Sequence, residues 1–278
     1  RAAVANAARL AAMDFGRRFI AGTNTKEVIQ AAQKQREMKR GFTLDILGEA
    51  VTSDREADGY FHAYCELLQS ISPVVNAWNE VPQVDHGVTG PLPRMNLSIK
   101  LSALDSHFDA VDHEGTTKRV AIRLLELLRL AAEQGAFINV DMEQYEKKDL
   151  TLHIFKSVLS EPEFAQVGDV GIVIQCYLSD ADRDLRQLQE WAENRGHPVW
   201  VRLVKGAYWD YETVHARYND WPIPVYQQKW QSDAAFERAA RFMMQHHQHL
   251  RPAIGSHNIR SITYAIAAAE HCDVPAAG

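Results

Sequence analysis

Hydrophobic and polar positions follow two different periodicities along the chain. Short runs of consecutive apolar residues predict buried strands, and between them apolar residues recur at helical spacing. The six predicted strands cover residues 42–47, 97–101, 137–141, 171–175, 199–204 and 252–257. Strands that alternate with helices in this way indicate βαβ crossovers and a parallel sheet.

The segment before the first strand is different. Residues 1–40 are expected to form two N-terminal helices that lead into a barrel domain of residues 41–278. The first helix would run through Leu10, and the second would end before Gly41. The four prolines between residues 72 and 95 predict a long loop.

Local signals predict several helix ends. Ser53 followed by Glu56 is a capping box and marks the start of one helix. Ser232 predicts the start of another. Gly135 and Gly196 each follow a stretch with helical spacing, and glycine in that place favours a helix C-terminus.

Polar residues stand at or near the carboxyl ends of five predicted strands. These residues are Lys100, Asp141, Gln175, Arg202 and His257. Catalytic residues of a (βα)8 barrel gather at that end of the strands. An open doubly wound sheet also binds ligands there, but no glycine-rich dinucleotide motif follows any strand. We therefore predict an α/β fold, a distorted (βα)8 TIM-like barrel with N-terminal helices, truncated here to about six βα units.

Composition and residue spacing argue against several classes of protein. The 278 residues carry 30 Lys and Arg against 36 Asp and Glu, a formal net charge of −6, which argues against nucleic-acid binding. The three cysteines lack metal-finger spacing, so a disulfide framework is not expected and a reducing compartment is favoured. No apolar run is long enough to span a membrane. The chain begins at Arg1, and we expect it to be an excised or processed piece.

Lys205 directly follows a strand and precedes Gly206. Two interpretations remain open for this lysine. A buried lysine amine can form a Schiff base with a carbonyl substrate. Alternatively, Lys205 binds an anion such as phosphate, and Gly206 allows the backbone to approach the ligand closely.

Lys100 interrupts an otherwise apolar strand, and a buried ammonium group requires a carboxylate partner. Asp141 is the expected partner because it ends the next predicted strand, and Glu143 is the alternative. His246 and His249 have the spacing of neighbours on a helix, but no carboxylate cluster accompanies them, so no metal site is predicted.

Several segments together resemble the proline dehydrogenase family, most closely the barrel of the bifunctional bacterial proline utilization A flavoproteins. The signature-like segment is 202–209, with the sequence RLVKGAYW. The other matching segments occur in the same order and are 45–50, 98–104, 141–143, 173–175, 224–226 with Lys229, and 256–258.

This resemblance implies a function. Such a protein oxidises L-proline to Δ1-pyrroline-5-carboxylate by hydride transfer to N5 of FAD, the first step of proline catabolism. It passes the electrons to a membrane quinone, which implies a cytoplasmic protein or one peripheral at the inner face of the membrane. A fused or separate pyrroline-5-carboxylate dehydrogenase would use the product.

The resemblance also implies roles for individual residues. Residues expected to line FAD, with Arg202 near N5, are Gln175, Arg202, Lys205, Gly206, Ala207, Trp209, Tyr226, Lys229, Ser256 and His257. Residues expected to shape the proline pocket are Lys100, Asp141, Leu203 and Tyr208, with Glu49 as a gating acid. The expected catalytic residues are Arg202, Lys100, Asp141 and Tyr208.

Two departures from the family pattern stand out. The family binds the proline carboxylate through two adjacent arginines, and no Arg-Arg pair follows Trp209 here, so this stretch alone is expected to bind proline poorly. Gln227 stands where some relatives carry threonine, which leaves one polar contact to FAD open. The alternatives to a flavoenzyme are a Schiff-base aldolase that uses Lys205 and a non-catalytic barrel module.

Overall fold

A computed structural model describes residues 16, 20–47, 51–88 and 90–275. Its centre is a six-stranded sheet in the order β1-β4-β5-β6-β7-β8, with every neighbouring pair parallel. The strands are β1 (Leu44–Asp45), β4 (Met95–Ile99), β5 (Ala136–Val140), β6 (Val170–Gln175), β7 (Val199–Val204) and β8 (Leu250–Gly255). The predicted α/β fold with six βα units is confirmed.

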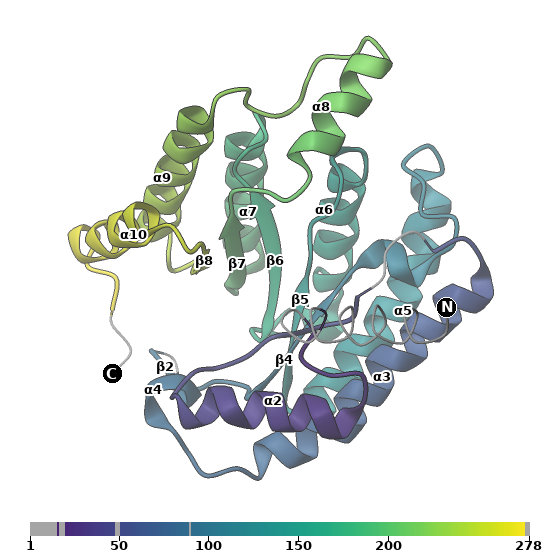
Figure 1. Cartoon of the computed structure of the whole chain (residues 1–278), viewed down its shortest axis with the longest axis vertical. Helices are drawn as coiled ribbons and strands as arrows, with labels where there is room; N and C mark the ends of the chain where they lie inside the picture. The colour runs from purple at the N-terminus through teal and green to yellow at the C-terminus, as the bar shows by residue number, and fades with distance from the viewer. Residues whose placement is uncertain (1–15, 17–19, 48–50, 89, 276–278) are drawn as a thin grey trace, which may run out of the picture.

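Helices follow each strand of the sheet and cover its outer face (Figure 1). The helices are α2 (Thr25–Glu37), α3 (Asp54–Asn76), α4 (Pro82–Asp85), α5 (His113–Gln134), α6 (Tyr145–Leu159), α7 (Ala181–Arg195), α8 (Trp209–Tyr218), α9 (Lys229–Gln245) and α10 (Ile259–His271). Two short 3-10 helices, η1 (Leu101–Leu104) and η2 (Pro162–Phe164), and a small hairpin of β2 (His86–Gly87) and β3 (Gly90–Pro91) complete the described part. In Figure 1, α2 and α4 lie at one end of the molecule and α8 at the other.

Strand β7 illustrates how the sheet separates its two faces. Val201 and Leu203 are fully buried in the apolar core beneath the helices. Trp200 and Arg202 alternate with them and are only partly buried. Because successive side chains point to opposite faces of a strand, the polar Arg202 faces the concave side of the sheet.

The sheet is strongly curved. A hydrogen bond of 3.1 Å joins Arg202 Nη2 in β7 to Ser98 Oγ in β4, although β5 and β6 lie between these strands. Three strand spacings amount to about 14 Å in a flat sheet, too far for the two side chains to meet. The curvature therefore brings the inner faces of β4 and β7 toward each other, as in a barrel.

The predicted caps of three helices are confirmed. The Ser53 hydroxyl accepts from Glu56 N, and the Glu56 carboxylate accepts from Thr52 N at 2.8 Å, so both side chains satisfy free amides at the start of α3. Gly135 and Gly196 end α5 and α7 with φ of +59° and +73°, a backbone conformation that glycine adopts without steric cost.

Three local predictions are wrong: the loop over residues 72–95, the helix start at Ser232, and the helix end just before Gly41. Residues 72–95 are not one loop, because α3 continues through Pro73 to Asn76; the burial of Ile71 and Val75 outweighs the local cost of proline. Ser232 lies inside α9, which begins at Lys229 behind a Gln228 cap.

Near the N-terminus, α2 ends at Glu37 rather than just before Gly41, and Lys39 turns the chain with a φ of +56°. The predicted helix through Leu10 falls outside the described residues. Within the part of the chain that is described, no helix is long and apolar enough to cross a membrane.

Candidate active site

Four charged residues meet on the concave side of the sheet, and we call them the charged cluster: Asp45, Lys100, Asp141 and Arg202. Asp141 Oδ1 accepts from Arg202 Nη1 at 3.1 Å, and Asp141 Oδ2 lies 3.7 Å from Lys100 Nζ. The backbone N–H of Asp141 donates to Ile99 O at 2.9 Å, which extends the β4–β5 pairing and fixes Asp141 beside Lys100. Three predicted catalytic residues are therefore brought together.

Asp45 lies closer to Lys100 than Asp141 does, and the sequence did not predict this contact. Lys100 Nζ donates to both Asp45 oxygens, at 2.9 and 3.1 Å. Strand β1 pairs with β4 so that Asp45 is opposite Ser98, two residues before Lys100. Among the described residues, Lys100 has at least two carboxylate partners, and removing Asp141 does not leave it without one. The alternative partner, Glu143, instead accepts from Ser102 Oγ at 2.6 Å.

Burial of the charged cluster affects the pKa of Asp141. Desolvation raises the pKa of Asp141 above its ordinary value, and the charges of Arg202 and Lys100 oppose that increase. The Lys100 side chain is only 9% exposed and that of Asp141 16%. At this depth, charge interactions are weakly screened and strongly affect protonation.

The loop between β7 and α8, residues 205–208, contains half of the segment that resembles the family signature. Gly206 has φ of +142°, and a Cβ atom there would overlap the ring of Tyr177, so this position requires glycine. Tyr177 OH in turn accepts from Tyr208 N at 3.2 Å. Gln175 is buried beneath the loop, donating to Glu143 O at 2.9 Å and accepting from Ala207 N at 3.4 Å.

Two lysines converge beyond this loop. Lys205 Nζ donates to one Asp233 oxygen at 2.5 Å, and Lys229 Nζ donates to the other at 2.6 Å. Hydrogen bonds from Lys205 and Lys229 hold the pKa of Asp233 below its usual range. The three side chains carry one net positive charge and are partly or fully accessible, which suits them to an anionic group.

The remaining predicted residues lie around these groups, with two exceptions. Trp209 Nε1 donates to Tyr226 O at 2.9 Å, and both side chains are at least partly accessible. Ser256 and His257 follow β8, whose Gly255 pairs with Val204 next to Lys205.

The two exceptions are Leu203 and Glu49. Leu203 is fully buried on the helix-covered face and is not brought to the charged cluster. Glu49 lies outside the described residues. Among the residues described, no group of three or more His, Cys, Asp or Glu side chains is arranged to hold a metal ion.

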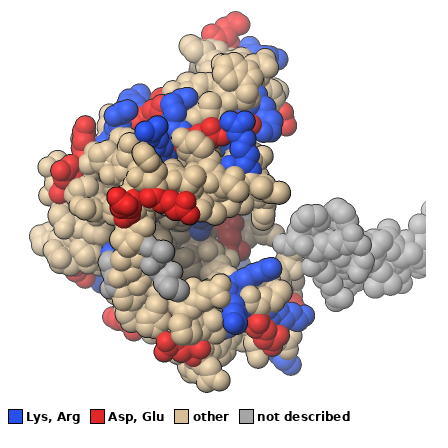
Figure 2. All heavy atoms as spheres, turned by 90° about the vertical axis from the view of Figure 1, so that its left-hand side faces the viewer, with Lys and Arg blue, Asp and Glu red and all other residues tan. Residues whose placement is uncertain are grey.

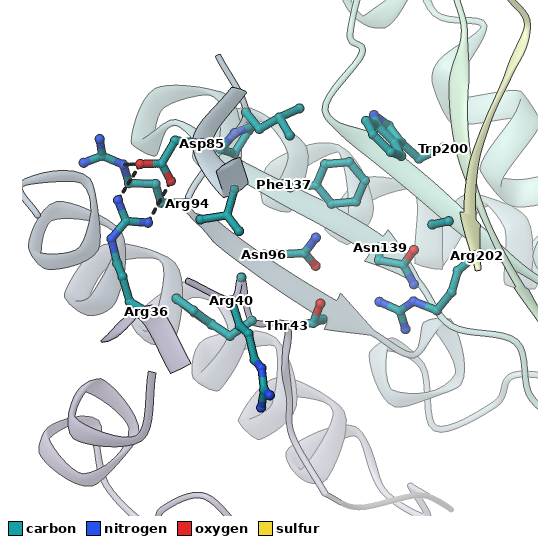
Figure 3. A pocket seen from close by; sticks show the side chains of 16 residues that line it. Arg36, Arg40, Thr43, Asp85, Arg94, Asn96, Phe137, Asn139, Trp200 and Arg202 are labelled. Carbon is teal, nitrogen blue, oxygen red and sulfur yellow. Dashed lines mark hydrogen bonds and ion pairs between the residues drawn. The ribbon is translucent and has the colours of Figure 1, made fainter. Parts of the chain in front are cut away.

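A cavity of about 370 Å³ extends from Arg202 toward the amino-terminal ends of the strands (Figure 3). Asn96, Asn139, Phe137 and Trp200 are among the residues that line it. At its far side, Arg36 and Arg94 both pair with Asp85. In the space-filling view, basic and acidic side chains are interspersed over the face shown (Figure 2).

Comparisons with known proteins indicate the family of this chain. A family model described as proline dehydrogenase matches residues 28–277. The bifunctional protein PutA of Escherichia coli K12 is 28% identical over 250 residues, which are 89% of this chain and 18% of that protein. Proline dehydrogenase of Deinococcus radiodurans is 28% identical over 77% of this chain and 59% of its own length.

The crystal structure of proline utilization A from Bdellovibrio bacteriovorus, inactivated by N-propargylglycine, matches with a TM-score of 0.95 and 42% identity, over 98% of this chain and 28% of that one. Proline utilization A from Corynebacterium freiburgense matches with a TM-score of 0.77 and 30% identity, over 89% of this chain and 24% of that one. The chain thus spans under a third of these larger relatives. The family model covers nearly all of its sequence, and the chain belongs to the proline dehydrogenase family.

Proposed function

We propose that this chain forms the FAD-dependent site that oxidises L-proline to Δ1-pyrroline-5-carboxylate. The observation that supports the proposal most directly is the charged cluster, which lies at the same edge of the sheet as the loop of residues 205–208. Sheets of this class bind ligands at the carboxyl ends of their strands. Membership of the proline dehydrogenase family supports proline as the substrate.

The residues present fit a flavin dinucleotide. The Lys205 and Lys229 ammonium groups suit its diphosphate, and the accessible Gly206 allows the backbone to approach it closely. The partly accessible rings of Trp209 and Tyr226 suit its flat rings. The proposed FAD-binding residues are Gln175, Arg202, Lys205, Gly206, Ala207, Trp209, Tyr226, Lys229, Ser256 and His257.

Proline would lie beside the charged cluster. In the reaction, the C5–H bond of proline breaks with loss of a hydride and the ring nitrogen loses a proton, which leaves a C=N double bond. Bound FAD would supply the hydride acceptor. The guanidinium of Arg202 stabilises the negative charge that the acceptor gains. Lys100, Asp141 and Tyr208 shape the proline pocket, with Glu49 as a gating acid.

The electron acceptor, the location of the protein and the enzyme that uses the product belong to the same proposal. The electrons would pass to a membrane quinone, from a protein that is cytoplasmic or peripheral at the inner face of the membrane. The relatives named as bifunctional support a fused or separate pyrroline-5-carboxylate dehydrogenase that uses the product. The carboxylate of proline would need a cationic clamp in addition to the charged cluster.

The aldolase alternative loses support at Lys205. A Schiff base forms from a neutral amine, whereas Lys205 Nζ lies 2.5 Å from the Asp233 carboxylate. The amine is thus engaged as a hydrogen-bond donor to a carboxylate and is not free to attack a carbonyl. Anion binding is therefore the better role for this lysine.

An absorption spectrum of the purified protein, recorded before and after L-proline is added, tests the proposal. Flavin bands near roughly 380 and 450 nm that bleach with proline are expected where the carboxylate clamp is present. If the flavin is bound but not bleached, the FAD site is supported and proline binding by this stretch alone is not. A colourless protein that takes up no FAD, and that borohydride traps covalently with a carbonyl substrate, would overturn the proposal in favour of an aldolase.

A further inference from the structure

A closed ring of hydrogen bonds links β4, the residue that follows β5, and β7, and it includes two members of the charged cluster. Arg202 Nη1 donates to Asp141 Oδ1, and Arg202 Nη2 donates to Ser98 Oγ, both at 3.1 Å. The Ser98 hydroxyl donates in turn to the same Asp141 oxygen, also at 3.1 Å. We call these three residues the Ser98 ring.

The Ser98 ring determines the orientation of a planar group. A guanidinium that donates through both of its terminal nitrogens to two fixed acceptors is held in one plane, whereas a single hydrogen bond leaves it free to rotate. Ser98 is only 1% exposed, so water does not readily compete for its hydroxyl. The Ser98 proton is committed to Asp141, which leaves an oxygen lone pair for Arg202.

The strands themselves hold the acceptors in place. Ser98 is an interior residue of β4 and is paired with Asn139 of β5. Asn139 Nδ2 also donates to Asp141 Oδ1 at 3.0 Å, so the carboxylate is fixed from two sides. The orientation of the Arg202 guanidinium therefore depends on the other two residues of the ring.

We propose that Ser98 is a positioning residue that holds the Arg202 guanidinium in the orientation needed to stabilise the reduced cofactor. This inference rests on the proposed function, because it takes Arg202 to lie at the flavin. Ser98 does not act on proline itself. It acts through Arg202, and its loss should change the electrostatics at the flavin more than it changes the stability of the fold.

The chain offers a matched control for this role. Ser102 is also buried, and its hydroxyl donates to the buried Glu143 carboxylate at 2.6 Å. Ser98→Ala and Ser102→Ala therefore each remove one hydrogen bond from a serine to a carboxylate, but only Ser98 also accepts from Arg202. Ser98→Thr retains the hydroxyl, and Arg202→Met removes the cation.

The experiment measures the midpoint potential of bound FAD by equilibration with redox dyes, and so requires no proline turnover. Ser98→Ala should weaken the preference of the site for reduced over oxidised flavin by about tenfold, which lowers a two-electron potential by about 30 mV. Arg202→Met should lower it further. Ser98→Thr and Ser102→Ala should leave the potential at the value of the unchanged chain, although Ser102→Ala lowers the thermal midpoint.

The outcomes separate the two proposals. A shift with Arg202→Met but none with Ser98→Ala refutes the positioning role and leaves the proposed function intact. Equal shifts with Ser98→Ala and Ser102→Ala also refute it, because the effect would then be a general response to loss of a buried hydrogen bond. If the unchanged chain binds no FAD, both proposals are overturned.

Discussion

Replacing Lys100 with methionine tests the charged cluster through its pH dependence. Methionine fills a similar volume and removes the ammonium group that lies 2.9 Å from Asp45 and 3.7 Å from Asp141. The Lys100–Asp141 attraction exists only while the carboxylate is ionised. The cost of the substitution should therefore be small at low pH and should increase as Asp141 loses its proton.

The magnitude follows from the geometry. At an effective dielectric constant of about 20, two charges 3.7 Å apart attract by about 4.5 kcal/mol. The pair with Asp45 adds less than its shorter distance suggests, about 1 kcal/mol or less, because the Asp45 side chain is 40% exposed. Methionine also relieves the cost of burying an ammonium group, which is several kcal/mol. We expect a net loss of about 1–3 kcal/mol once Asp141 is ionised.

The shifted pKa of Asp141 determines how stability changes with pH. Burial raises the pKa of Asp141 in the folded state, so the folded chain binds this proton more tightly than the unfolded chain. The stability contributed by Asp141 is therefore greatest below its ordinary pKa of about 3.9 and decreases as pH rises through the raised value. Without Lys100, which opposes the increase, the pKa of Asp141 rises further and this decrease becomes larger.

Urea unfolding monitored by circular dichroism at several pH values between about 4 and 8 provides the measurement. The stability curves of the two proteins should run close together at the acid end and separate as pH rises. Lys147→Met is the control, because Lys147 lies 3.6 Å from Glu143, outside the charged cluster. A constant difference between wild type and Lys100→Met across the whole range would refute the reasoning.

Three further predictions concern other sites. Gly206→Ala should weaken FAD binding and lower the thermal midpoint, since its Cβ would overlap Tyr177; unchanged flavin affinity in a fluorescence titration would contradict this. Asp184→Asn breaks a 2.5 Å ion pair with the buried Lys148, which still pairs with Asp149 and Asp180, so it should cost about 1–3 kcal/mol in urea unfolding; a cost below about 0.5 kcal/mol would contradict this. The hydrogen bond from Arg36 lowers the pKa of Asp85, so the stability that the ionised carboxylate contributes is present above about pH 4 and is lost as the pH falls further. Acid unfolding of Asp85→Asn should therefore show a shallower pH dependence than that of the unchanged chain.

The sequence predicted β6 and β7 well because each of these strands buries several residues of a short apolar run. The run 199–204 coincides with β7, and the run 171–175 differs from β6 by one residue. The prediction from sequence failed where burial outweighs local propensity. Pro73 predicted a loop, but the apolar side chains beside it pack into the core and keep α3 continuous.

The candidate site shows a similar division. Polar residues at strand ends were recognisable one at a time, as with Lys100 and Arg202. Their partners were not, because pairing between distant strands decides which side chains meet. Asp45 contacts Lys100 only because β1 pairs with β4 in a particular register, and the spacing of residues along the sequence does not indicate that register.

The curvature of the sheet has a consequence for folding kinetics. The contacts of Ser98 and Arg202 join positions 104 residues apart, and those of Asp141 and Arg202 join positions 61 apart. Closing such long segments costs conformational entropy before the contact can compensate, so these contacts tend to form late. An intermediate that has paired β4 with β5 but has not yet added β7 would contain most of the helices and lack the guanidinium of the charged cluster. Recovery of flavin affinity during refolding should therefore lag behind the recovery of helical circular dichroism.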